Sequence, residues 1–256
     1  MGLSLILSTY TLPRDRGLRL SKTPTARQTP NKGTKSPPTQ HTLAPKPIED
    51  DDGHTPPEMS LRRILIISLG NPGEYRNTYH SAGHVVLEAL QRQLGREQPP
   101  FSPDRVGRQT TLASIGPRYS LLQSPAIMNV SGPWVAKAYR EHLAERGVGP
   151  AELGLVLVHD DLEEELGVVK IRDWKRSHRG HNGVKSVNGA LQRPGADSKW
   201  ARVSVGIGRP DARDKGVVSD FVLSKMSGQA RGVLQGGGAR GLLEALAELE
   251  GQWADE

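Results

Sequence analysis

The chain has 256 residues, enough for one substantial domain with an appended segment. It contains no cysteine, which excludes disulfides and a thiolate site. No apolar run approaches the roughly 18 residues of a membrane-spanning helix, so a membrane span is excluded. The formal net charge of +6 favours an anionic partner.

Residues 1–59 form an extension rich in Pro, Ser, Thr, Lys and Arg, without sustained apolar periodicity. Such a segment cannot bury enough apolar area to offset the entropy of ordering it, so we expect it to be disordered. Arginines with few acidic residues between them are typical of a transit peptide, which would direct the protein to the mitochondrion. A solvated tail on a cytoplasmic protein is the alternative. The folded domain is predicted to span residues 60–256.

Short apolar runs predict strands at 65–69, 110–115, 119–123, 155–158, 168–171 and 203–207. Apolar residues at helical spacing predict helices at 82–94, 131–146, 182–191, 225–234 and 241–253. The Gly116-Pro117 turn makes two of the strands a hairpin. Between the last two helices, the glycines at 236–238 predict a flexible hinge or loop.

Strands that alternate with helices predict an α/β fold. We expect a single three-layer domain in which a mixed, mostly parallel sheet lies between helices. In such open sheets, ligands bind in the loops that leave the carboxyl ends of the strands.

Polar side chains gather where four predicted elements end or begin. They are Asn71, Tyr75 and His80, then Asn129, then His159 and Asp160, then His178, His181 and Asn182. Each has a purely structural alternative, because an Asn before a helix is often its N-cap and an Asp after a strand often begins a turn. His178 and His181 lack the further His or Cys that a zinc site needs, so no metal is predicted.

Five motifs occur in the order seen in bacterial-type peptidyl-tRNA hydrolases, which the chain resembles over about residues 65–223. They lie at 71–80, 128–132, 159–162, 180–183 and 206–210. The resemblance implies hydrolysis of the ester that joins a peptide to the 3′ end of tRNA, which recycles tRNA from drop-off products. It also implies a monomer that needs no metal or cofactor and binds the acceptor stem and 3′ end of peptidyl-tRNA.

The resemblance extends to individual positions. His80 falls on the family's general base, and Asp160 falls on the carboxylate that holds this imidazole. Asn71 matches the amide that distinguishes blocked from free amino groups. The other substrate-binding positions are those of Tyr75, Ile127, Asn129, His181 and Asn182.

Ester hydrolysis gives these residue types a chemical reason. Water is a poor nucleophile, and a positioned imidazole that takes its proton contributes about 10²–10⁴-fold. A neighbouring carboxylate fixes the tautomer of the imidazole and stabilises the imidazolium. Amide N–H groups can then meet the negative charge that develops on the carbonyl oxygen.

Basic residues in the second half of the chain predict contacts with tRNA phosphates, with a solvated basic face as the alternative. The predicted contacts are Lys170, Arg172, Arg179, Arg202 and Arg209. The family clamps the terminal 5′ phosphate of tRNA with two cations. In this chain Arg172 stands at one of those positions and Ser204 at the other.

Other departures from the family pattern surround the predicted site. Tyr79 and Ser81 replace an arginine and an asparagine on either side of His80. Ile127 stands where an aromatic residue is common, and the three acids at 163–165 replace a Pro-rich turn. These changes affect expected affinity rather than the predicted reaction.

Two other functions compete with the hydrolase. One is a non-catalytic RNA-binding module on the same scaffold, resembling the plant chloroplast intron-splicing relative of the family. The other is an esterase for small acyl substrates, against which the missing Gly-x-Ser-x-Gly motif and the many cations argue.

Overall fold

The computed structural model describes residues 63–191, 195, 198–210 and 214–254. All of them lie in the second of two compact units, Thr55–Glu256. The predicted extension 1–59 and the predicted domain start at residue 60 lie outside the described residues.

Within the described residues, seven strands form one mixed sheet in the order β2-β3-β4-β1-β5-β7-β6. Their bounds are β1 (Arg63–Ser68), β2 (Ser102–Val106), β3 (Gln109–Ile115), β4 (Tyr119–Gln123), β5 (Leu153–Asp161), β6 (Val169–Asp173) and β7 (Trp200–Gly206). The central strands β4, β1, β5 and β7 run parallel, while β2, β3 and β6 pair antiparallel at the edges. The carboxyl ends of β4, β1, β5 and β7 therefore meet at one edge of the sheet.

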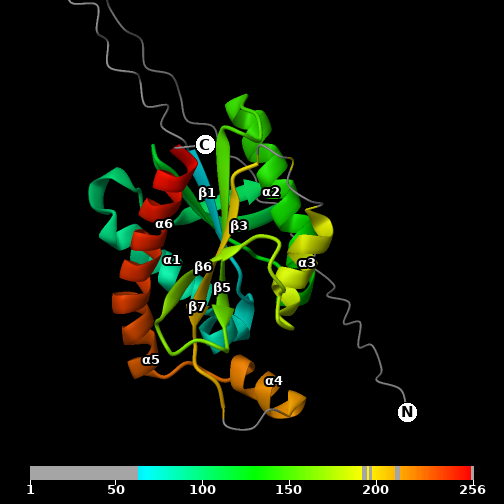
Figure 1. Ribbon diagram of the computed structural model, residues 1–256, viewed down its shortest axis with the longest axis vertical. Coiled ribbons are helices and arrows are strands. Elements are labelled where there is room, and N and C mark those ends of the chain that lie inside the picture. The colour runs from blue at the N-terminus through cyan, green and yellow to red at the C-terminus, as the bar shows by residue number, and fades with distance from the viewer. Residues whose placement is uncertain (1–62, 192–194, 196–197, 211–213, 255–256) are drawn as a thin grey trace, which may run out of the picture. The chain divides into compact units, whose positions relative to one another are not determined.

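Helices cover both faces of this sheet (Figure 1). Ile64 and Ile66 of β1 join one apolar core, and Leu65 and Ile67 join the other, because successive strand side chains point to opposite faces. The first face is covered by α1 (Ala82–Gln93), α5 (Gly228–Val233) and α6 (Ala239–Ala254), the second by α2 (Ser131–Arg146) and α3 (Asn182–Ala190). The predicted three-layer α/β fold is confirmed.

The described connections contain four short helices, and three of these helices border the predicted site. Their bounds are η1 (Gly73–Asn77), η2 (Tyr79–Ser81), η3 (Gly95–Glu97) and η4 (Met128–Val130). Of the helices in the described part of the chain, none combines the length and the apolar character needed to cross a membrane.

Besides the short helices, strand β2 and helix α4 were not predicted, and the predicted loop at 236–238 is wrong. Strand β2 carries Pro103 and is exposed except at Val106, and it pairs with β3 alone, at the end of the sheet. Helix α4 (Lys215–Leu223) begins at Asp214, whose side chain accepts a hydrogen bond from the N–H of Gly216. The hinge predicted at 236–238 is instead part of a π-helical turn, η5 (Leu234–Gly238), that continues α5 into α6.

Helix α2 begins against α3, and this contact holds two site segments together. The N–H of Gly132 donates to Ser186 Oγ at 2.9 Å, and a methyl group on Gly132 would lie 2.0 Å from the Ser186 carbonyl oxygen. We therefore expect Gly132→Ala to lower the free energy of unfolding by roughly 1–3 kcal/mol, as overpacking does. Urea unfolding followed by circular dichroism measures this loss.

Gly189→Ala is the matched control, since Gly189 lies on α3 with no atom within 4 Å of the added methyl group. Alanine favours a helix over glycine, so this variant should be neutral or slightly more stable. Equal stability of Gly132→Ala and the wild type would contradict the close α2–α3 contact.

Candidate active site

A cavity of about 870 Å³ lies where the loops from the carboxyl ends of the parallel strands converge. Its walls come from the loop after β1, from η4, from the end of β5, from the β6–α3 loop and from α4. Every predicted site residue except Lys170 lines it, namely Asn71, Tyr75, His80, Ile127, Asn129, Asp160, Arg172, Arg179, His181, Asn182, Arg202 and Arg209.

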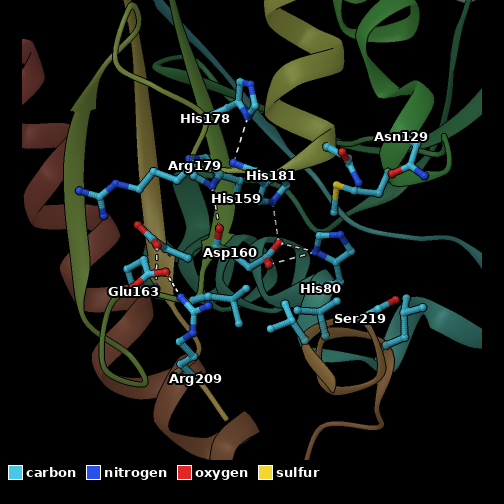
Figure 2. A pocket seen from close by; sticks show the side chains of 18 of the residues that line it. His80, Asn129, His159, Asp160, Glu163, His178, Arg179, His181, Arg209 and Ser219 are labelled. Carbon is cyan, nitrogen blue, oxygen red and sulfur yellow. Dashed lines mark hydrogen bonds and ion pairs between the residues drawn. The ribbon is translucent and has the colours of Figure 1, made fainter. Parts of the chain in front are cut away.

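His80 and Asp160 are in direct contact inside this cavity (Figure 2). The Nδ1 atom of His80 lies 2.9 Å from Asp160 Oδ1 and 3.0 Å from Oδ2. Because an ionised carboxylate only accepts hydrogen bonds, Nδ1 carries the proton, and the lone pair of a neutral ring is on Nε2. Eighty residues apart in sequence, the two groups thus form an imidazole–carboxylate pair with a free basic nitrogen.

The charges in this pair reinforce each other. Burial alone would raise the pKa of Asp160, but the charges of His80 and His181 and their hydrogen bonds hold it well below its ordinary range. Burial alone would lower the pKa of His80, but the charge of Asp160 and its hydrogen bond raise it above 6.5. The carboxylate is therefore ionised at neutral pH, and the pKa of His80 lies above its ordinary value.

His181 binds the same carboxylate from the other side. Its Nε2 atom lies 2.9 Å from Asp160 Oδ1, and its Nδ1 accepts the N–H of Val184 at 3.2 Å as the N-cap of α3. Since a backbone N–H can only donate, Nδ1 holds the lone pair and Nε2–H donates to Asp160. Both ring nitrogens of His181 thus form hydrogen bonds within the protein. The sequence predicted a substrate-binding role for His181 but could not show these contacts.

A third imidazole, that of His159, contacts both His181 and Asp160. It is buried, packs edge-on against His181 with ring centroids 5.0 Å apart, and its Nδ1 lies 2.7 Å from the carbonyl oxygen of Asp160. Burial lowers its pKa to about 3, so His159 is neutral at physiological pH. The sequence indicated His159 only by its position beside Asp160 at the end of a buried strand. Its packing against His181 is visible only in the structure.

Three of these groups could in principle offer ligands to a metal ion. One atom each of His80, Asp160 and His181 lies within 4.8 Å of the others. In the arrangement described above, both imidazole nitrogens that face Asp160 donate protons to it. A cation would have to replace both protons, so these residues favour a hydrogen-bonded cluster over a metal site.

The amide of Asn71 is oriented by the backbone of η4. Its Oδ1 accepts the N–H of Met128 at 2.9 Å, which leaves the Nδ2 hydrogens as the free part of the amide. Ser81, one of the departures from the family pattern, fixes the same loop, since its Oγ accepts from the N–H of Asn71 and donates to the carbonyl of Tyr75. Asn71 is buried, and the contact with Met128 directs its side-chain donors.

The other predicted substrate-binding residues form the exposed rim. Asn129 in η4 and Asn182 at the start of α3 are exposed, and Tyr75 and Ile127 are among the exposed large apolar side chains. Helix α4 forms the opposite wall, where Phe221 stacks on Tyr79 with ring centroids 4.8 Å apart. Tyr79, which stands where the family has an arginine, thus packs α4 against the chain directly before His80.

The predicted phosphate-binding cations do not share one environment. Arg202 is 2% exposed and donates to the carbonyls of Asp173 and Arg176, so its guanidinium is engaged inside the protein and its contact with phosphate stays a prediction. The sequence shows that Arg202 is charged, but it does not show that the side chain is buried. Arg179 is exposed on the cavity wall and has a left-handed backbone, with φ of 46°. The remaining three, Lys170, Arg172 and Arg209, are paired with carboxylates.

Known proteins are similar to this chain in sequence and in fold. The profile of the family described as peptidyl-tRNA hydrolase matches residues 65–249. A peptidyl-tRNA hydrolase of Anaeromyxobacter dehalogenans is 38% identical over 165 residues, which cover 64% of this chain and 78% of that protein. One of Geobacter metallireducens is 34% identical over 191 residues, which cover 73% and 87%.

Among solved structures, the peptidyl-tRNA hydrolase of Acinetobacter baumannii is similar with a TM-score of 0.57 and 25% identity. The similarity covers 75% of this chain and 90% of that one. A family profile that spans most of the chain agrees with relatives of the same name and with the fold. The chain therefore belongs to the peptidyl-tRNA hydrolase family.

Proposed function

We propose that this chain hydrolyses the ester bond between a peptide and the 3′-terminal ribose of tRNA. The observation that carries this proposal is the contact between His80 and Asp160 in the cavity of a chain that belongs to this family. The alternative of a non-catalytic RNA-binding module is not favoured, because the relatives and the similar structure are hydrolases by name.

In the proposed reaction, neutral His80 acts through Nε2 as a general base. It removes a proton from water as the oxygen attacks the ester carbonyl, and Asp160 stabilises the imidazolium that forms. Exposed amide N–H groups of Asn129 or Asn182 are suited to the negative charge on the carbonyl oxygen. The imidazolium then returns the proton to the departing ribose oxygen, which yields a peptide acid and tRNA with a free hydroxyl group.

Turnover on a defined substrate tests this function. The purified protein should release N-acetyl-phenylalanine from N-acetyl-Phe-tRNA over many cycles, measured by acid-soluble radiolabel. Binding of the same tRNA without any hydrolysis would contradict the hydrolase and favour the RNA-binding module.

The oriented amide of Asn71 supports recognition of the blocked amino group. Its Nδ2 donors can bind the carbonyl of an N-acyl group, whereas they repel the ammonium of a free aminoacyl-tRNA. Asn71→Asp keeps an oxygen for the N–H of Met128 but replaces the donors with negative charge. We expect it to lower kcat/KM for N-acetyl-Phe-tRNA by roughly 5–100-fold, the equivalent of about 1–3 kcal/mol for an unmet polar contact.

The ratio of kcat/KM for N-acetyl-Phe-tRNA to that for Phe-tRNA checks this assignment. It should fall in Asn71→Asp, because the new carboxylate attracts the free ammonium. A variant that loses activity on both substrates equally would contradict a role in discrimination. Circular dichroism on the same samples separates either result from unfolding.

The finer properties of this enzyme are part of the proposal. The exposed cations of the 175–179 loop are suited to the phosphates of the acceptor stem, and a monomer is sufficient because one chain supplies the whole cavity. The arginine-rich composition of the first residues supports a mitochondrial address, with the cytoplasm as the alternative. Imaging a fusion of residues 1–50 to a fluorescent protein tests that address.

A further inference from the structure

Glu164 connects two cations that were predicted to bind phosphate. Its Oε2 lies 2.6 Å from Lys170 Nζ, and its Oε1 lies 2.5 Å from a terminal nitrogen of Arg172. A bound phosphate would bridge two cations in the same way, with one oxygen for each. The carboxylate of Glu164 therefore stands where an anionic ligand of Lys170 and Arg172 would be.

Arg172 uses Nε and one terminal nitrogen of its guanidinium in contacts within the protein. Besides Glu164, its guanidinium contacts Asp161 Oδ2 at 3.1 Å, and its Nε donates to Ser204 Oγ at 3.0 Å. The side chains of Arg172 and Glu164 are only 11% and 12% exposed, so water and salt screen this pair less than a surface pair. The hydrogen bond from Lys170 also lowers the pKa of Glu164, which keeps the carboxylate ionised at neutral pH.

A second pair extends the same pattern. Arg209 forms an ion pair with Glu163, the preceding residue of this loop (Figure 2). All three cations that face the loop are thus matched by its carboxylates, whereas Arg179 forms no ion pair within the described residues. A phosphate that bound between Lys170 and Arg172 would therefore have to displace the carboxylate of Glu164.

We propose that Glu164 determines how strongly this enzyme holds RNA, by occupying the anion site between Lys170 and Arg172. The inference rests on the proposed function. Phosphate contacts are shared by peptidyl-tRNA and by the tRNA product, so they add uniform binding that does not speed the reaction. With this site occupied by Glu164, discrimination depends more on the acyl end of the substrate, and the product leaves more readily.

Removing the charge of Glu164 without changing its size tests this role. Glu164→Gln should lower the Kd for deacylated tRNA and the KM for N-acetyl-Phe-tRNA by about 5–10-fold at low salt, with the single-turnover rate constant unchanged. The slope of log Kd against the logarithm of the salt concentration should increase by about 0.7–1.8, which corresponds to one or two additional phosphate contacts.

Glu165→Gln is the matched control, since Glu165 is the next residue, is exposed, and has no ion pair among the described residues. It removes the same charge from the same loop and should leave Kd within about twofold, because screened surface charges contribute little. Equal gains in both variants would reduce the effect to net charge and overturn the role of Glu164. An unchanged or weaker tRNA affinity in Glu164→Gln would overturn it as well.

Two further measurements keep the test decisive. If Glu164→Gln is unstable by circular dichroism, Glu163→Gln, whose side chain is 43% exposed, should still show a smaller gain in tRNA affinity by releasing Arg209. Absence of any gain there would then overturn the inference. Because Kd for deacylated tRNA needs no turnover, a shift in Kd without hydrolysis would contradict the proposed function and leave the anion site intact.

Discussion

Replacement of His80 by alanine should lower kcat by about 10²–10⁴-fold, the contribution of a positioned general base. The reason is geometric, because Nδ1 of His80 is held at 2.9 Å from Asp160 and Nε2 is left as the basic nitrogen in the cavity. Single-turnover hydrolysis of N-acetyl-Phe-tRNA at saturating enzyme measures the chemical step apart from binding.

His178→Ala is a suitable comparison, because His178 also lines the cavity but its Nδ1 accepts the N–H of Gly180 rather than contacting Asp160. This variant should retain most of the single-turnover rate. Full activity of His80→Ala would refute His80 as the base. A loss of equal size in both variants would indicate disruption of the cavity rather than removal of a base.

The sequence was sufficient for the parts of the fold that follow from local pattern. Strand β1 and helix α2 were predicted because an apolar β-branched run and a helical apolar spacing, respectively, have few alternative structures. Strand β2 was missed since Pro103, Asp104 and Arg105 give it a polar, turn-like composition that only pairing with β3 makes extended. Helix α4 was missed because β-branched residues such as Val217 and Val218 favour strands in isolation.

The site divides in the same way. The sequence predicted that the cavity residues lie together, because their motifs follow parallel strands whose carboxyl ends share one edge of the sheet. Three outcomes depended on side-chain contacts that the residue pattern does not show: the tautomer of His181, the burial of Arg202, and the pairing of Arg172 with Glu164. Charge is visible in a sequence, but whether a neighbouring carboxylate already neutralises it is not.

Replacement of Asp160 by asparagine should have the second large effect, a fall in kcat of about 10⁴-fold by analogy with the serine-protease triad. An asparagine can donate to Nδ1 of His80, which would move the ring proton to Nε2 and remove the lone pair that attacks the proton of water. The same substitution removes the charge that raises the pKa of His80, while the burial that lowers it remains. The residual activity should therefore show its acid limb at lower pH than the wild type.

The pH profile separates this role from simple loss of structure. In the wild type the base is active when neutral, so kcat/KM should rise with pH through a midpoint above 6.5. Asp161→Asn is the matched control, because Asp161 is the neighbouring carboxylate but contacts Arg172 instead of an imidazole. It should retain both kcat and the midpoint. An Asp160→Asn enzyme with an unmoved acid limb and near-normal kcat would show that the ring of His80 acts without this carboxylate.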